Sequence, residues 1–268
     1  MIPANFEYIK ANSVEEAVNL LQQHGYDAKL LSGGHSLIPA LKLRLNSAQI
    51  LIDIGKIPDL NNISEQGDEI VVGANCTHSQ IEKSTLVREK LNILSQTAGV
   101  IGDVQIRNHG TIGGSLAHSD PSSDYPATVL ATKATIDVQG PNGKRSIPAN
   151  EFFQGIFTTA LEDDEMITSI RFPKTSNGVY LKFFQAASRF AVVGCAAVKN
   201  GSGVSVGVTG VSDTPYRASS VESAYDGSSS AAQHAVDGVD VMEDHYASSE
   251  YRAHLAKVFV RRALEQLE

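Results

Sequence analysis

Two glycine pairs flanked by hydroxyl side chains constrain this chain more than any other feature. The first lies in the segment SGGHS at residues 32–36, and the second lies in TIGGS at residues 111–115, 80 residues further along. Glycine lets a backbone approach a ligand closely, and successive N–H groups in a tight turn form a concave site for an anion. Neither segment contains an acidic residue, so both suit a pyrophosphate. Each pair is equally consistent with an ordinary turn.

Short helix and strand patterns surround the first pair. Ser13 and Glu16 form a capping box, and apolar residues recur with helical spacing from Val14 to Leu21, so a helix is predicted up to Gly25. Strands are predicted at residues 28–31 and 49–54. The first glycine pair therefore follows a strand directly.

The middle of the chain has a similar alternation. A long helix is predicted at residues 79–98, the second glycine pair is predicted to lie in a loop, and a short helix is predicted at residues 125–132. The strands predicted here are residues 69–72, 134–139, 144–147 and 166–172, of which the second and third form a hairpin around Gly140-Pro141-Asn142-Gly143.

A polar segment at residues 174–178 marks a predicted domain boundary. Strands are predicted after it at residues 179–186, 191–199 and 204–211, followed by helices at residues 229–236 and 249–267. The C-terminal part is therefore expected to be a small sheet covered by helices.

Composition excludes several functional classes. The chain has 22 Lys and Arg against 30 Asp and Glu, a net charge of −8, which gives no electrostatic basis for binding nucleic acid. No apolar run approaches the roughly 18 residues that a membrane span requires. The two cysteines, Cys76 and Cys195, lie far apart without a CxxC motif, so the chain alone is not expected to bind an iron–sulfur cluster or any other metal. The N-terminus lacks a secretory signal pattern, which predicts a cytoplasmic location.

The common catalytic and nucleotide motifs are absent. There is no GxGxxG opening a helix, no P-loop, no HExxH and no GxSxG. A Rossmann dehydrogenase, a P-loop NTPase and a serine hydrolase are therefore disfavoured. His35 and His109 lie beside the glycine pairs, where a histidine can bind a ligand or simply cap a turn, and the sequence leaves both interpretations open.

Three segments carry a family resemblance. Residues 29–36, 111–124 and 182–194 resemble the FAD-binding medium subunit of the molybdenum hydroxylases, the group of carbon monoxide dehydrogenase, xanthine dehydrogenase and bacterial aromatic hydroxylases. The resemblance covers essentially the whole chain. It implies an α+β fold of the vanillyl-alcohol-oxidase-like FAD-binding type, with a domain at residues 1–175 made of two α/β subdomains, about 1–56 and 57–175. A C-terminal domain at residues 176–268, with a three-stranded antiparallel sheet and helices, is expected to follow.

The resemblance also implies a cofactor site. The FAD pyrophosphate would lie between the two glycine segments, and Asp124 would bind ribose or polyol hydroxyls, although it also suits a helix N-cap. Lys182 would lie beside a flavin carbonyl or in solvent, and Phe190 would cover the ring or, as favoured slightly, pack in the core. The implied cofactor-binding residues are Lys29, Leu30, Leu31, Ser32, Gly33, Gly34, His35, Ser36, Ile101, Thr111, Ile112, Gly113, Gly114, Ser115, Asp124, Ile167, Lys182 and Phe190. No catalytic residue and no metal ligand is expected.

The function implied by the resemblance is electron transfer. FAD would be the cofactor of this chain, while molybdopterin and [2Fe-2S] clusters would lie only in partner subunits. These partners are an iron–sulfur small subunit and a molybdopterin large subunit, in a dimer of heterotrimers. The substrate is left open, and a quinone or another carrier is favoured over NAD as acceptor. The alternatives are a scaffold subunit without FAD and a free-standing flavin oxidase.

Overall fold

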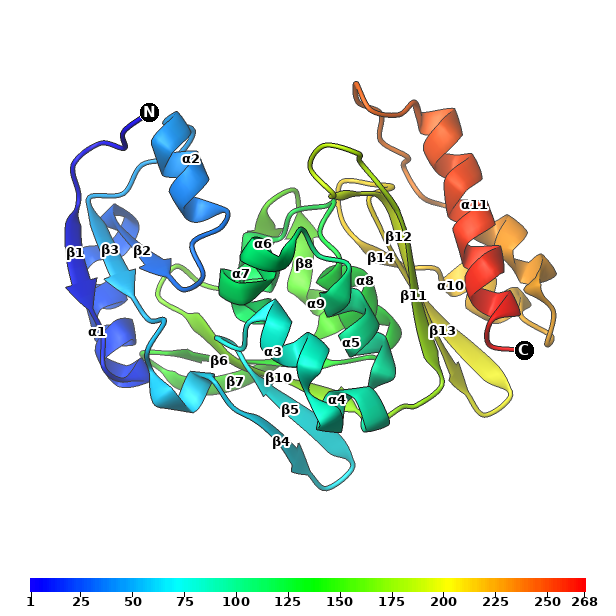
Figure 1. Cartoon of the computed structure of the whole chain (residues 1–268), viewed down its shortest axis with the longest axis horizontal. Helices are drawn as coiled ribbons and strands as arrows, with labels where there is room; N and C mark the ends of the chain where they lie inside the picture. Colours follow the sequence, from blue (N-terminus) through cyan, green and yellow to red (C-terminus); the bar gives the residue numbers. More distant parts are fainter.

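A computed structural model describes all 268 residues of the chain. Three larger sheets follow one another along the molecule, each with its own helices, and the N- and C-termini lie on opposite sides (Figure 1). The N-terminal sheet is parallel, whereas the central and C-terminal sheets are antiparallel. This mixed architecture confirms the predicted α+β fold class.

The N-terminal unit contains the first predicted helix. Helix α1 (Val14–His24) starts where the Ser13 hydroxyl accepts a hydrogen bond from the N–H of Glu16, and it ends at Gly25, whose φ is 52°. The helix packs its apolar face on three parallel strands in the order β1-β3-β2. The strands are β1 (Glu7–Lys10), β2 (Ala28–Leu31) and β3 (Ile50–Asp53), and the unpredicted helix α2 (Leu37–Leu43) follows β2.

The central unit is built on five strands in the order β4-β5-β10-β6-β7. The strands are β4 (Ile63–Gln66), β5 (Glu69–Gly73), β6 (Thr135–Gly140), β7 (Gly143–Pro148) and β10 (Met166–Pro173). Strands β6 and β7 form the predicted hairpin. A two-stranded sheet, β8 (Phe153–Gly155) with β9 (Thr158–Thr159), lies beside this unit. A 3-10 helix, Pro58–Leu60, comes just before β4 in the chain.

Short helices gather on one side of the central sheet (Figure 1). They are α3 (His78–Lys83), α4 (Thr85–Lys90), α5 (Asn92–Gly99), α6 (Val104–His109), α7 (Ile112–His118), α8 (Tyr125–Ala131) and α9 (Ala149–Phe152). The single helix predicted at residues 79–98 is therefore wrong. The chain breaks at Ser84, which is extended and whose hydroxyl caps α4, and again at Leu91, whose backbone leaves the helical region.

The C-terminal sheet has one more strand than expected. Its order is β11 (Gly178–Phe184), β12 (Ala191–Asn200), β13 (Gly203–Thr209) and β14 (Tyr216–Arg217), so the expected three-stranded sheet gains a fourth, two-residue strand. Helices α10 (Ser219–Ala224) and α11 (Ser249–Glu265) follow. The segment predicted as a helix at residues 229–236 is a 3-10 helix, Ser229–His234. A last 3-10 helix, Gly25–Asp27, lies in the N-terminal unit.

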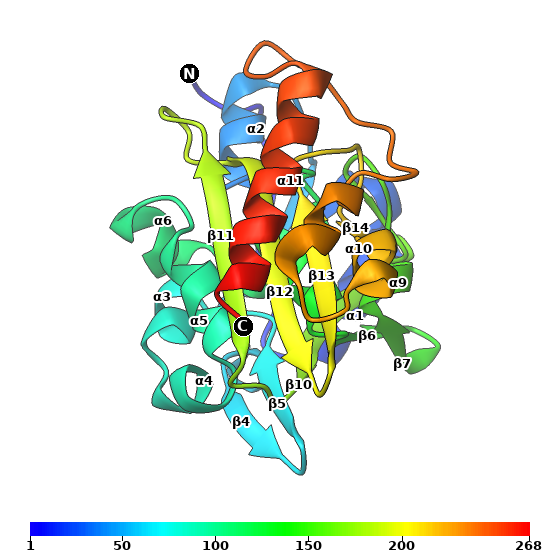
Figure 2. The same ribbon diagram turned by 90° about the vertical axis from the view of Figure 1, so that its right-hand side faces the viewer.

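Strand β12 is buried on both faces, which joins the C-terminal sheet to the rest of the molecule. Ala196 and Val198 belong to the core that the sheet shares with the central unit. Cys195 and Ala197, on the opposite face, pack in the core beneath α11, which crosses the sheet in Figure 2. Burial raises the pKa of the Cys195 thiol to about 12 and that of Cys76 to about 11, so both thiols stay protonated at neutral pH.

The close approach of α8 to the C-terminal sheet gives a test of this packing. A Cβ atom on Gly207 would lie 2.1 Å from the carbonyl oxygen of Ala127, whereas the nearest atom to a Cβ on Gly203, in the same strand, is 3.8 Å away. We expect Gly207→Ala to lower the free energy of unfolding by about 1–3 kcal/mol through overpacking. Gly203→Ala should change it by less than about 0.5 kcal/mol. Urea unfolding of both variants measures the difference, and equal effects would contradict this packing.

Candidate functional site

The first glycine segment presents free backbone donors. It lies between β2 and α2, at the carboxyl end of a parallel strand, where ligands commonly bind in α/β sheets. None of the N–H groups of residues 33–36 donates a hydrogen bond within the chain, and Gly34 has a φ of 73°, which favours glycine. Four consecutive unbonded N–H groups form a site suited to an anion.

The second glycine segment is not a loop, which corrects the prediction. Gly113 and Gly114 lie in the first turn of α7, and the Thr111 hydroxyl caps this helix by accepting a hydrogen bond from the N–H of Gly114. The N–H groups of Ile112 and Gly113 donate to the carbonyl oxygens of Cys76 and Ala74. These donors are therefore used within the chain, and the expected row of free N–H groups exists only at the first segment.

The two glycines of the second segment have different roles. A Cβ atom on Gly113 would lie 2.7 Å from the Cβ of Ala74, so this residue lets α7 pack closely on the segment after β5. Gly114 is exposed, and a Cβ there would meet only the Thr111 hydroxyl, at 2.9 Å. Glycine within a helix is less stable than alanine by about 0.5–1 kcal/mol. Because Gly114 carries no side chain, it leaves the helix surface open for a ligand to approach.

Direct contacts hold the two segments side by side. A Cβ on Gly33 would lie 2.2 Å from the carbonyl oxygen of His109, so backbone meets backbone there. The Ser32 hydroxyl donates to Oδ1 of Asn75 at 2.6 Å and lies 3.0 Å from the Thr111 hydroxyl. Asn75 is buried, and its amide donates to the carbonyl oxygen of Ile54 at 2.6 Å. Asn75, which follows β5, therefore ties the first glycine segment and the end of β3 to the central unit, although no sequence pattern marks it.

The histidines near the glycine segments are of two kinds. His35 and His109 are exposed, and their rings meet edge to face with centroids 5.4 Å apart, at the point where the glycine segments touch. His78 is buried beneath Gly110, and its Nδ1 lies 3.1 Å from the Tyr125 hydroxyl. Burial, with smaller contributions from His35 and Arg107, lowers the pKa of His78 to about 3, so it is neutral at physiological pH.

A second polar cluster lies around Asp124. The Tyr180 hydroxyl donates to this carboxylate at 2.6 Å, and Nζ of Lys182 lies 2.9 Å from it and donates to the carbonyl oxygen of Val100. Asp124 occupies the N-cap position of α8, but its side chain forms no capping hydrogen bond, and the Lys182 side chain is only 5% exposed. The interpretation of Lys182 as a solvated lysine is therefore wrong, whereas Asp124 is an N-cap by position only. Burial raises the pKa of Asp124, against the opposing effect of Lys182 and Tyr180.

The remaining predicted residues lie in different environments. Lys29, Leu30 and Leu31 form β2 before the first glycine segment, and Ile101 follows α5 and is half-buried. Ile167 lies in β10 and is buried in the central core. Phe190 is 41% exposed in the loop between β11 and β12, so the slight preference for a core position is wrong. The loop is tied to the segment after α5 by a hydrogen bond from Arg189 to the carbonyl oxygen of Gly102.

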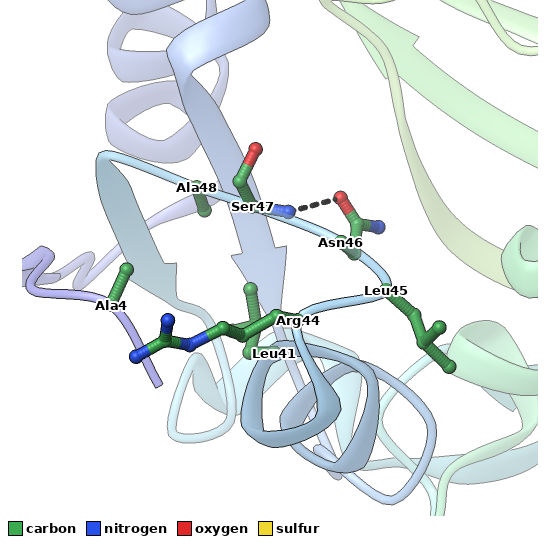
Figure 3. A pocket seen from close by; sticks show the side chains of 7 residues that line it. All are labelled: Ala4, Leu41, Arg44, Leu45, Asn46, Ser47 and Ala48. Carbon is green, nitrogen blue, oxygen red and sulfur yellow. Dashed lines mark hydrogen bonds between the residues drawn. The ribbon is translucent and has the colours of Figure 1, made fainter. Parts of the chain in front are cut away.

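A separate hollow of about 510 Å³ lies at the C-terminal end of α2 (Figure 3). It is lined by Ala4, Leu41, Arg44, Leu45, Asn46, Ser47 and Ala48. None of the predicted site residues lines it, so it is distinct from the glycine segments. No group of three or more His, Cys, Asp or Glu side chains is arranged to hold a metal ion.

Two protein-family models together match almost the whole chain. Residues 4–175 match the model of the FAD binding domain in molybdopterin dehydrogenase, and residues 179–267 match the CO dehydrogenase flavoprotein C-terminal domain. The chain belongs to this flavoprotein family. The predicted family resemblance is thereby confirmed.

Relatives match the chain over almost its full length. The carbon monoxide dehydrogenase medium chain of Hydrogenophaga pseudoflava is 39% identical over 98% of this chain and 97% of the relative. The glyceraldehyde dehydrogenase medium chain of Sulfolobus acidocaldarius is 32% identical over all of both chains.

Solved structures of the family share the fold. A chain of the Hydrogenophaga pseudoflava carbon monoxide dehydrogenase that lacks the Mo-pyranopterin moiety is 39% identical, with a TM-score of 0.95 over 100% of this chain and 98% of that one. A chain of quinoline 2-oxidoreductase from Pseudomonas putida 86 is 26% identical, with a TM-score of 0.93 over 100% and 98%. No helix of this family member is both long and apolar enough to cross a bilayer.

The depressed pKa of His78 predicts acid sensitivity with a defined sign. The unfolded histidine, with a pKa near 6.5, binds a proton that the folded one, at about 3, does not, so the free energy of unfolding falls as pH drops below 6.5. His78 contributes up to about 1.4 kcal/mol per pH unit to this loss. His78→Gln should make the fall shallower between about pH 7 and pH 5 in urea unfolding experiments. Equal slopes for wild type and variant would contradict the buried neutral state.

Proposed function

We propose that this chain is the FAD-carrying medium subunit of a molybdenum-containing hydroxylase or dehydrogenase complex. It binds FAD non-covalently and passes electrons from the iron–sulfur clusters of a partner subunit to an external acceptor. The observation that carries this proposal is the row of four unbonded N–H groups at residues 33–36, beside the open surface of Gly114. Relatives named as medium chains of carbon monoxide and glyceraldehyde dehydrogenases support the place in a complex.

The glycine segments would hold the pyrophosphate. The N–H groups of residues 33–36 would donate to its oxygens, the second segment would face it from the other side, and the exposed Gly114 would leave room for the phosphates to approach. Asn75 holds Ser32 against the central unit by its hydrogen bonds, and the Ser32 hydroxyl lies beside that of Thr111 in the second segment. The set of 18 residues implied by the family resemblance remains our proposal for the cofactor contacts.

The cluster around Asp124 would form the other part of the site. A carboxylate oxygen accepts hydrogen bonds from hydroxyls, and the Lys182 ammonium places a positive charge beside it. Phe190 is exposed on the adjacent loop and free to cover a ring. Bound FAD would supply the redox chemistry, and the residues of this chain would bind it, orient it and set its electrostatic surroundings.

The rest of the assembly follows from this role. The partners are an iron–sulfur small subunit and a molybdopterin large subunit, and we propose a dimer of heterotrimers in the cytoplasm. The chain would divide into the cofactor-binding residues 1–175 and the C-terminal residues 176–268. We favour a quinone or another carrier over NAD as acceptor. Substrate oxidation takes place in the molybdenum subunit, so no residue here acts as an essential acid or base.

Gly114 gives the most specific test of cofactor binding. A Cβ there meets only the Thr111 hydroxyl, at 2.9 Å, so a valine should fold after a small shift of that side chain, yet it would occupy the room that the phosphates need. We expect wild type to bind one equivalent of FAD and Gly114→Val to bind it at least about tenfold more weakly, which corresponds to about 1.4 kcal/mol. Titration with FAD, followed by flavin absorbance and fluorescence, measures both.

The control is Ala117→Val, which enlarges the side chain at another exposed position of α7 and should leave FAD affinity unchanged. Gly33→Val is unsuitable, because its Cβ would collide with the backbone of His109 and a loss of FAD would reflect misfolding. Equal FAD affinity of Gly114→Val and wild type would show that the pyrophosphate does not bind at this surface. A folded wild type that binds no FAD, even with its partner subunits, would favour the scaffold alternative.

The composition of the native assembly tests the electron-transfer role. We expect the chain, purified under mild conditions from the cells that make it, to copurify with iron, acid-labile sulfide and a pterin in fixed ratios to FAD. Metal analysis and cofactor extraction measure these ratios. A chain that carried FAD alone and oxidised a substrate without partners would instead support a free-standing flavin oxidase.

A further inference from the structure

Arg252 in α11 is a fully buried arginine far from the glycine segments in sequence. Its side chain has no solvent exposure, and it lies outside residues 4–175, which match the FAD-binding family model. A buried guanidinium is costly unless its donors are used, because the charge has left water. Its contacts therefore indicate what it does in the molecule.

The guanidinium ties together the ends of two strands. Nη1 donates to the carbonyl oxygen of Val192, at the start of β12, at 2.8 Å, and to that of Gly210, just after β13, at 2.5 Å. Nη2 lies 2.7 Å from Oδ2 of Asp244 but forms no hydrogen bond of normal geometry, so this contact is electrostatic, and Nε has no partner. The arginine thus joins α11 to the open end of the C-terminal sheet.

The same strand ends hold the segment that leads to Asp124. The N–H of Gly210 donates to the carbonyl oxygen of Pro121 at 2.8 Å, and the N–H of Ala191 donates to that of Ser122 at 3.0 Å. The Thr209 hydroxyl lies 2.7 Å from the carbonyl oxygen of Pro121 and 2.9 Å from that of Ser123. Residues 121–123 therefore lie across the ends of β12 and β13, on strand ends that Arg252 holds.

Two residues of the proposed cofactor site adjoin these contacts. Asp124 directly follows the segment at residues 121–123, and Phe190 directly precedes Ala191. Gly210 has a φ of 80°, and a Cβ on it would lie 2.6 Å from the carbonyl oxygen of Val192, so the two strand ends approach closely at this point. A small separation of the strand ends would move both Asp124 and Phe190.

We propose that Arg252 is a positioning residue for FAD: by joining Val192 and Gly210 it fixes the strand ends that orient Asp124 and Phe190. This inference rests on the proposed function, because it assumes that FAD contacts these two residues. It assigns the C-terminal helix a part in cofactor binding. Arg252 acts through the backbone and touches no cofactor itself.

The test compares FAD binding with stability in three variants of the full chain. Arg252→Met keeps the volume but removes the donors, and it should weaken FAD binding about tenfold or more and alter the visible flavin spectrum. Arg252→Lys keeps one charged donor group, which cannot reach all three partners at once, and it should weaken binding about threefold. FAD titration, visible circular dichroism of the bound flavin and the urea midpoint are measured for each.

Leu255→Ala is the matched structural control. Leu255 is buried in the core under α11, one turn after Arg252, so its truncation lowers the urea midpoint but removes none of the hydrogen bonds to Val192 and Gly210. We expect its FAD affinity and flavin spectrum to remain those of wild type. Loss of FAD affinity in Leu255→Ala equal to that in Arg252→Met would reduce Arg252 to a general stabiliser and overturn the proposal.

The remaining outcomes are also decisive. If Arg252→Met does not fold, Arg252→Lys provides the test. Unchanged FAD affinity and an unchanged flavin spectrum in Arg252→Lys then overturn the proposal. If wild type binds FAD and Arg252→Met binds it equally well, the positioning role fails while the proposed function stands. If wild type itself binds no FAD with its partners present, the proposed function fails first, and the positioning role fails with it.

Discussion

The candidate site depends on one contact, where the backbone at Gly33 meets the backbone at His109 with no room for a side chain between them. This approach brings the end of β2 onto the central unit, and the hydrogen bonds among Ser32, Asn75 and Thr111 fix it. Residues 33–36 lie at this contact, and their N–H groups find no partner within the chain. The packing of the first two units therefore places free donors beside the second glycine segment, where an anionic ligand would use them.

The two glycine pairs show how similar sequences take different roles. The first glycine pair lies in a loop with free donors, whereas the second glycine pair lies in the first turn of a helix. Gly113 serves packing against Ala74, and Gly114 leaves surface open. Cofactor binding in this fold is therefore expected to combine backbone donors from one unit with an unobstructed helix surface from another.

Local signals predicted much of the fold, and tertiary contacts explain most of the failures. Helix α1 and the β6–β7 hairpin were predictable because the Ser13 cap and a Pro-Asn-Gly turn act within a few residues, although Glu16 accepts from Asn12 and does not complete the predicted capping box. The helix at residues 79–98 failed because Ser84 can end one helix and cap the next. In the site, the glycine segments were identifiable from the sequence, whereas Asn75 was not. Its partner Ser32 lies 43 residues away, and an isolated asparagine carries no local pattern.

The most direct test of this account is amide hydrogen exchange of the peptide containing residues 33–36, with and without FAD. Without the cofactor these N–H groups have no hydrogen-bond partner, so they should exchange rapidly. With FAD bound they should become protected, while the N–H groups of Ile112 and Gly113, already bonded to Cys76 and Ala74, should change little. Unchanged exchange of residues 33–36 in the presence of stoichiometrically bound FAD would contradict the central claim that this loop binds the pyrophosphate.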